Sequence, residues 1–218
     1  MRRKRTIVRF NALTMSKEIL NLGNQNTENR FEGKTVCIFA GGSSLRGFDF
    51  DRYKKSKTEN IVTIAVNHGT FHMESDYFAF IDSIMIQELE AKRGKEWSSV
   101  VPCICAEYSG AAPEPEKIFV VRIDNRELHL NPPTSPHRSN STSLAIGFSL
   151  LANAKKIYVL GLDGGSHWYL HPAETVQRNS MKFFEQYKEK ITLVGEHSFY
   201  KEFCRITQEK FFNDFAIS

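Results

Sequence analysis

The sequence predicts an α/β fold with a mainly parallel sheet and helices on both of its faces. Short apolar runs of strand length recur along the chain, and stretches of helical pattern lie between the later ones. Several of these runs end in glycine-rich or polar sequence. Such alternation is typical of parallel sheets, because two parallel strands need a crossover connection. The length of 218 residues fits a single domain.

The candidate strands are apolar and are bounded by glycine or polar residues, as buried strands are. They are TVCIFA (35–40), IVTIAV (61–66), YFAFID (77–82), SVVPCICA (99–106), KIFVVRI (117–123), KIYVLGLD (156–163) and ITLVG (191–195).

The clearest candidate helix, residues 140–156, opens with Asn and Ser, which are preferred at helix starts. A second, amphipathic helix is predicted over residues 172–190, with Pro172 near its start. A last helix is predicted over residues 199–212, and a short one near residues 15–22.

The chain divides into a basic, polar arm (1–30) and a domain (31–218). Six of the seven prolines fall between 102 and 136, which predicts a loop-rich insertion over 102–138. Five Arg and Lys residues among the first nine outweigh the net charge of +4, so the rest of the chain is close to neutral. A solvated tail is expected there, and contact with an anionic partner is the alternative.

No apolar run approaches the roughly 20 residues of a membrane-spanning helix. No secretory signal follows the basic start. A soluble, cytoplasmic protein is therefore expected. The four cysteines, Cys37, Cys103, Cys105 and Cys204, form no C-x-x-C pair and are predicted to be buried free thiols.

Polar residues gather where the predicted strands end, and ligands of parallel sheets bind beyond the carboxyl ends of the strands. Glycines there let backbone N–H groups approach an anion, and serines add hydroxyl donors. This pattern predicts a nucleotide or phosphate site, and simple capping of the strands is the alternative. The residues are Gly41, Gly42, Ser43, Ser44, Asn67, Asp82 and Asp163.

Two further segments carry candidate chemistry. Arg138 precedes a helix start formed by Asn140, Ser141 and Thr142, where backbone N–H groups and the helix dipole favour an anion. The segment GLDGGSHWYLHP (161–172) holds His167 and His171. Their spacing of four suits a metal, but no third ligand is evident, so a general base that titrates near neutral pH is the preferred role.

An ordered set of segments resembles the bacterial sialyltransferases of glycosyltransferase family 42. The relatives of that family include uncharacterised phage and bacterial proteins and an archaeal pterin diphosphokinase. The resemblance covers about residues 34–205, and the first loop of the family reads Gly-x-Gly-Pro-Ser-Leu where this chain has Ala40 and Ser43 in place of the first glycine and the proline. The segments are FAGGSSL, VNHGTF, FID, RSNSTSLAIGFSLLANAKKIYVLGLD, a following histidine and ITLVGEHSFYKEF.

The resemblance implies a Rossmann-like domain that transfers a sugar from a nucleotide-linked, CMP-type donor without a metal or other cofactor. It implies that His171 removes the proton of the acceptor hydroxyl. It also implies that Asn67, Asp82 and the segment from Arg138 to Ser141 contact the donor. The acceptor is expected to be a saccharide, a lipid-linked sugar or a modified DNA base, and a homo-oligomer is left open. Only seven residues separate Asp163 from His171, so the lid of the family is predicted to be short or absent.

Two other functions remain open at this stage. One is diphosphate transfer from ATP, as in the pterin branch, which needs magnesium with Asp82 or Asp163 as ligands. The other is a non-catalytic nucleotide-binding protein of a phage or bacterium.

Overall fold

The computed structural model describes the strands of a sheet and several of the helices beside it. For residues 43 and 105, and for the described residues between 118 and 129, the structure describes the backbone but not the side chain. The described residues are 29–67, 69, 73–80, 85, 88, 91, 101–105, 118–120, 122–123, 128–129, 140–163, 181–182, 184–195 and 200–215.

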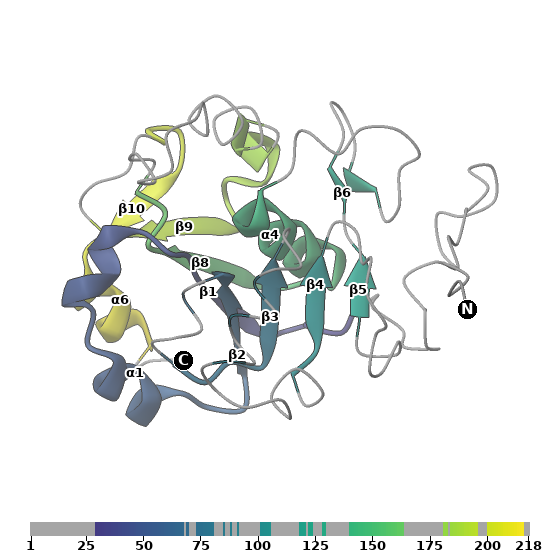
Figure 1. Ribbon diagram of the computed structural model, residues 1–218. Helices are drawn as coiled ribbons and strands as arrows, with labels where there is room; N and C mark the ends of the chain where they lie inside the picture. Colours follow the sequence, from purple (N-terminus) through teal and green to yellow (C-terminus); the bar gives the residue numbers. More distant parts are fainter. Residues whose placement is uncertain are drawn as a thin grey trace, which may run out of the picture.

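Eight parallel strands form one sheet in the order β10-β9-β8-β1-β2-β3-β4-β5 (Figure 1). This confirms the predicted α/β class, and the architecture is that of a Rossmann-like domain. The strands are β1 (Thr35–Phe39), β2 (Ile61–Val66), β3 (Tyr77–Phe80), β4 (Cys103–Cys105), β5 (Ile118–Val120), β8 (Lys156–Leu160), β9 (Ile191–Val194) and β10 (Cys204–Ile206).

The order of the strands reverses once, between β1 and β8. From β1 the chain moves outward through β2, β3 and β4 to β5. The helix α4 (Ser141–Leu151) then leads back to β8, on the other side of β1, and β9 and β10 follow outward from there. Phe39, the last residue of β1, is paired with Ala65 of β2 and Leu160 of β8, so these three strands end at the same level.

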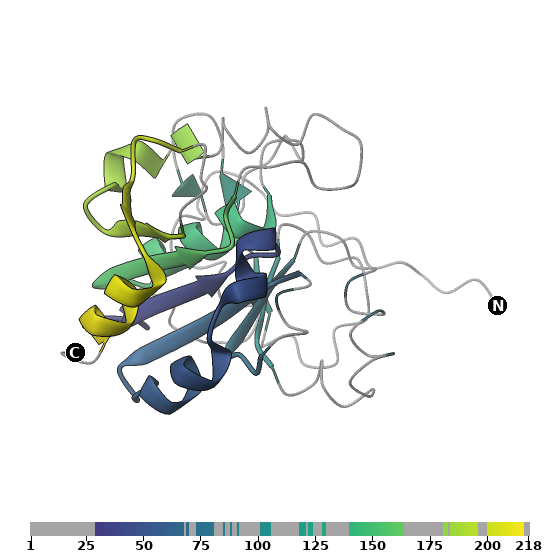
Figure 2. The same ribbon diagram turned by 90° about the vertical axis from the view of Figure 1, so that its left-hand side faces the viewer.

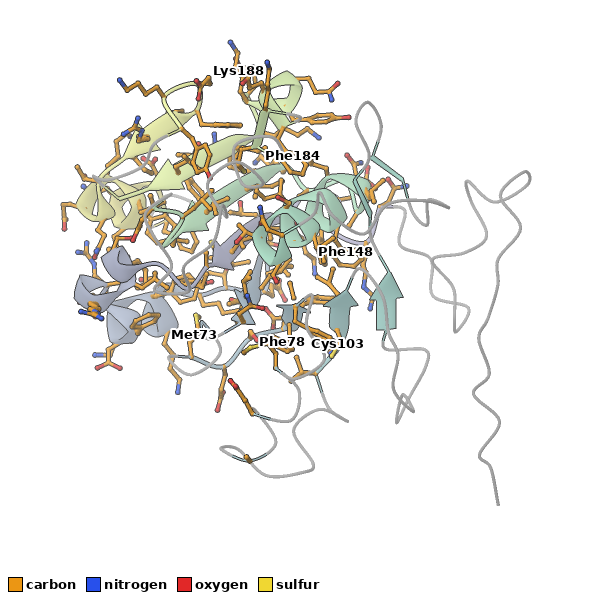
Figure 3. The ribbon with its side chains drawn as sticks, turned by 45° about the horizontal axis from the view of Figure 1, so that its top comes forward. Met73, Phe78, Cys103, Phe148, Phe184 and Lys188 are labelled. Atoms are coloured by element: carbon orange, nitrogen blue, oxygen red, sulfur yellow. The ribbon has the colours of Figure 1, made fainter. Side chains whose placement is uncertain are left out.

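Two apolar layers cover the sheet because its strands are apolar on both sides, as in β2, where all six residues are buried. Val36 and Ile38 of β1 pack on the side of α4, together with Met181 and Phe184. The alternate residues Cys37 and Phe39 pack on the opposite side, against α1 (Phe50–Ser56) and α6 (Gln208–Phe215). Figure 2 shows α1 and α6 together on one side of the sheet, and Figure 3 places Phe148 and Phe184 on the other.

The helix α4 runs against the direction of the strands. Its carboxyl end adjoins the amino ends of β1 and β8, where Lys155 N–H donates to Lys34 O at 2.9 Å. Its 11 residues rise by about 16 Å, which is close to the span of a five-residue strand. The first turn of α4 therefore lies at the carboxyl edge of the sheet.

Some elements differ from the expectation. The predicted helix over 199–212 is wrong in its first half, because Cys204–Ile206 form the edge strand β10 and only the second half contributes to α6. The predicted strand KIFVVRI divides into β5 and β6 (Arg122–Ile123), and β6 pairs with β7 (Leu128–His129) in a small antiparallel sheet. Cys204 is exposed, which corrects the expectation of four buried thiols.

Parts of the prediction lie outside the described residues or on their margin. The helix near 15–22 and nearly all of the basic arm are not described. Of the helix predicted over 172–190, residues 181, 182 and 184 are helical, and a 3-10 turn, η4 (Glu185–Tyr187), follows. Within the described part of the chain, no helix is both long and apolar enough to cross a bilayer.

Candidate functional site

The carboxyl ends of β1 and β8 meet at the point where the strand order reverses. In open parallel sheets this switch point is where the connections leave to opposite faces and open a crevice for a ligand. Here β1 continues into η1 (Ser43–Gly47) and α1, and Leu45 and Phe48 pack on the α1 side. After β8 the chain returns on the α4 side, with Met181 and Phe184. Residues 40–44 and 161–163, which follow β1 and β8, therefore lie at the switch point.

The loop after β1, residues 40–44, is bonded directly to the end of β8. Ala40 N–H donates to Leu160 O at 2.8 Å, and Gly42 N–H donates to Gly161 O at 2.9 Å. Ser44 N–H donates to Asp163 Oδ2 at 2.8 Å, and the Ser44 hydroxyl donates to Asp163 Oδ1. The sequence predicts Gly42, Ser44 and Asp163 as separate ligand contacts, whereas in the structure the loop that holds Gly42 and Ser44 is bonded to the end of β8 that holds Asp163.

Three glycines at this edge are required by close packing. A Cβ on Gly42 would lie 2.2 Å from Gly161 O and 2.6 Å from Asp163 Oδ2. Gly161 has a φ of +72°, and a Cβ there would press on Leu45 and on Ala40 O. A Cβ on Gly69 would lie 2.5 Å from Phe39 O. By contrast, a Cβ on Gly41 would meet open space, and Gly41 is exposed.

Asn67 follows β2 directly and lies beside the β1 end, since β1 and β2 are in register up to Phe39 and Ala65. It is half-buried and has a φ of +47°, a left-handed conformation that Asn tolerates better than most residues. The prediction that Asn67 stands at the carboxyl edge is confirmed, and a contact with a nucleotide stays a prediction.

The first turn of α4 brings further donors to the same edge. Asn140 is its N-cap, and its Oδ1 accepts from Ser143 N–H at 2.8 Å. Ser141 and Thr142 follow and are buried, with 7% and 8% of their surface exposed. No acidic residue lies in this turn, so the partial positive charge of the helix start is not neutralised there by a side chain of its own. The predicted helix start is confirmed.

Four of the predicted site residues fall outside the described residues, and the side chain of Ser43 does as well. Their roles stay predictions. They are Asp82, Arg138, His167 and His171.

Three residues of this edge are not among the predicted site residues: Gly161, Gly69 and Ser143. Gly161 stood in the quoted segment GLDGG, but its left-handed backbone follows from the way the loop after β1 crosses it. Ser143 belongs to the polar run NSTS, and a count of consecutive polar residues at the helix start would have included it. Among the side chains that the structure describes, no three His, Cys, Asp or Glu gather as a metal would require.

Comparison with known proteins gives no family for the chain. No protein-family model matches it, and no curated protein matches it. A solved structure that is similar is the thiamin pyrophosphokinase of Geobacillus thermodenitrificans, with a TM-score of 0.42 and 13% sequence identity. The match covers 73% of this chain and 59% of that one. These comparisons add nothing for or against the resemblance to the sialyltransferases.

Proposed function

We propose that this protein binds a nucleotide at the carboxyl edge of its sheet and transfers the group that the nucleotide carries to a hydroxyl of an acceptor. The observation that supports this most is the switch point, where the ends of β1 and β8 are bonded together beside the start of α4. Switch points of this kind are the usual ligand sites of doubly wound sheets. Ser and Asn side chains and the backbone N–H groups of a helix start suit the phosphates and sugar of a nucleotide.

The first candidate reaction is transfer of a sugar from a nucleotide-linked donor, which rests on the sequence resemblance. In this mechanism His171, or else His167, takes the proton of the acceptor hydroxyl as general base. Arg138 and the start of α4 stabilise the leaving phosphate through fixed donors. The acceptor would be a saccharide, a lipid-linked sugar or a modified DNA base.

The second candidate reaction is diphosphate transfer from ATP, and the position of Asp163 is the observation that supports it. A carboxylate at the end of β8, beside the loop after β1, is well placed to hold magnesium on a polyphosphate. However, both oxygens of Asp163 accept from Ser44. Magnesium binding would therefore have to share or displace these hydrogen bonds, so the second candidate predicts that magnesium alters the loop after β1.

A thermal-shift screen of CMP, UDP, GDP and ATP, each with and without magnesium, tests the proposal. A nucleotide at 100 times its Kd should stabilise the fold by about 2.7 kcal/mol. Stabilisation by a pyrimidine or guanine nucleotide without magnesium supports sugar transfer, and stabilisation by ATP only with magnesium supports diphosphate transfer. If none of the four nucleotides raises the melting temperature, the proposal is wrong.

Turnover then separates an enzyme from a non-catalytic nucleotide-binding protein. With the donor that the screen selects, His171→Ala should lower kcat by about 10²–10⁴ while leaving nucleotide affinity nearly unchanged, and His167→Ala should have a milder effect. Binding without release of the carried group, in the presence of saccharide and other hydroxyl acceptors, supports the non-catalytic alternative.

A further inference from the structure

The loop after β1 has few donors left for an anion, although its glycines and serines look like a phosphate-binding turn. Gly42 N–H is bonded to Gly161 O, and Ser44 N–H and its hydroxyl are both bonded to Asp163. An anion at this loop would also meet the negative charge of that carboxylate. This loop is therefore poorly suited to hold the phosphate of the proposed function, and another part of the same edge suits it better.

The first turn of α4 has the donors that the loop lacks. Asn140 Oδ1 accepts from Ser143 N–H, and the backbone oxygen of Asn140 accepts from Leu144 N–H. The N–H groups of Ser141 and Thr142 have no acceptor inside the helix, as is general for a first turn, and no backbone oxygen of the described residues accepts from them. Both residues are more than nine-tenths buried.

Two side-chain donors add to these backbone groups. Asn140 Nδ2 and Ser143 Oγ are buried and have no hydrogen-bond partner within the described ranges. Ser143 is fully buried. Because Asn140 Oδ1 is held on Ser143 N–H, the amide nitrogen must lie at the start of the helix. Side chains on a helix lean toward its amino end, and this tendency favours the same turn for Ser143 Oγ.

Such buried donors are costly unless an acceptor meets them, and polar groups without one are rare in folded proteins. Every group in this set can donate a hydrogen bond, and the helix dipole adds positive potential, so an oxyanion is the ligand that complements all of them. We propose that the first turn of α4, rather than the loop after β1, holds a phosphate of the ligand, with Asn140 Nδ2 and Ser143 Oγ as buried donors to it. This inference rests on the proposed function, because it names the part of the site that binds the phosphate.

Two variants test the inference without weakening the fold. Ser143→Ala removes a hydroxyl that no described residue satisfies, so the free protein should melt at the same temperature or higher. Asn140→Asp keeps an oxygen for the helix cap and exchanges the NH₂ donor for a second oxygen, which repels an anion. Ser149→Ala is the matched control, because Ser149 is equally buried on α4 but donates to Ala145 O at 2.7 Å.

The measurement is calorimetric titration with CMP, ATP plus magnesium, the nucleosides cytidine and adenosine, and inorganic pyrophosphate. In Ser143→Ala the affinity for phosphate-bearing probes should fall by about ten- to a hundred-fold, as for the loss of one hydrogen bond to a charged group. The fall should be larger in Asn140→Asp, and affinity for the nucleosides should be unchanged in both. Ser149→Ala should bind every probe as the wild type does.

Unchanged affinity of Ser143→Ala and Asn140→Asp for all phosphate-bearing probes would mean that these donors face an internal water or the protein itself, and would overturn the inference. An equal loss for CMP and cytidine would also overturn it, because the contact would then be to the nucleoside. If the wild type binds pyrophosphate but no nucleotide, and Ser143→Ala binds pyrophosphate more weakly, the proposed function fails while the anion site stands. If the wild type binds no probe at all, both are wrong.

Discussion

At the scale of single residues, Gly42 lies where the loop after β1 crosses the end of β8. Its missing Cβ would fall on Gly161 O and on the carboxylate of Asp163. Neither neighbour can easily move, since Gly161 O accepts from Gly42 N–H and Asp163 is held by two bonds from Ser44. The adjacent Gly41 has no atom within 4 Å of the same position.

This difference gives the first prediction. Gly42→Ala should lower the free energy of unfolding by about 1–3 kcal/mol or more, as overpacking of a tight site does. Gly41→Ala is the matched control and should stay within about 0.5 kcal/mol of the wild type, as surface substitutions usually do. Urea unfolding of the three proteins measures the difference. Equal stability of the two variants would show that the loop after β1 and the end of β8 are not packed as described.

The thiols give a second prediction at this scale. Burial raises the pKa of Cys37 well above its usual value and raises that of Cys103 to about 12, so both are protonated at neutral pH and closed to reagents. Cys204, on the edge strand β10, is exposed. Iodoacetamide at pH 8 should therefore modify Cys204 in the native protein, and Cys37 and Cys103 only after unfolding in urea. Peptide mass spectrometry measures each site, and native modification of Cys37 would contradict the described core.

The sequence predicted which polar residues gather at the carboxyl edge, because the ends of apolar runs can be read directly. It did not predict that Ser44 would bond to Asp163, 119 positions away. That contact depends on β8 lying next to β1, and strand order is a property of the whole sheet. For the same reason, the polar run NSTS predicted where α4 begins. It did not predict which donors of this helix start are left without an acceptor.

At the scale of elements, α1 contacts α6 through the buried ring of Tyr53, which packs on Phe211 and Phe215, and through Arg52. Arg52 forms a bidentate ion pair with Glu209, with N–O distances of 2.9 and 3.3 Å. The guanidinium carbon of Arg52 also lies 4.3 Å from the centre of the Phe212 ring. The ion pair is exposed, whereas Phe211, Phe212 and Phe215 of α6 are buried against the sheet. Apolar burial therefore holds α6 in place, and the ion pair adds a smaller, pH-dependent contribution.

The third prediction concerns that pH dependence. The hydrogen bonds from Arg52 lower the pKa of Glu209. The stabilisation is therefore complete above the pKa of an unfolded Glu, about 4.3, and is lost as the pH falls through the lowered pKa of the folded state. Glu209→Gln should melt slightly below the wild type at pH 7, and the two should converge in strong acid. Melting temperatures from pH 2 to 8 measure this, and a constant gap would contradict the ion pair as its cause.

Sequence pattern predicted the buried strands best, because β2 and β8 are continuous apolar runs. It missed β10, whose three residues are exposed or half-buried and which is a strand only through its pairing with β9. It also missed α1, although the signals were present. Asp49 caps that helix by accepting from Arg52 N–H at 2.8 Å, and Lys54 and Lys55 lie in its last turn. At seven residues α1 is too short for a periodic pattern to stand out.

At the scale of the whole molecule, the two edges of the sheet differ in character. At the amino edge, backbone hydrogen bonds such as Lys155 N–H to Lys34 O and Ile157 N–H to Lys190 O join neighbouring segments, and none of the described candidate site residues lies there. The carboxyl edge holds the switch point between β1 and β8, the left-handed Asn67 and the first turn of α4. A ligand that belongs to this fold should therefore change the carboxyl edge and leave the amino edge as it is.

Amide hydrogen exchange with and without the nucleotide that the screen selects locates the ligand on one of these two edges. We expect slower exchange on binding in peptides that cover residues 40–45, 140–144 and 161–163. Peptides covering residues 32–35, 154–157 and 188–191, at the amino edge, should exchange at the same rate in both states and serve as the internal control. Protection confined to the amino edge, or spread evenly over the chain, would contradict a nucleotide site at the β1–β8 switch point.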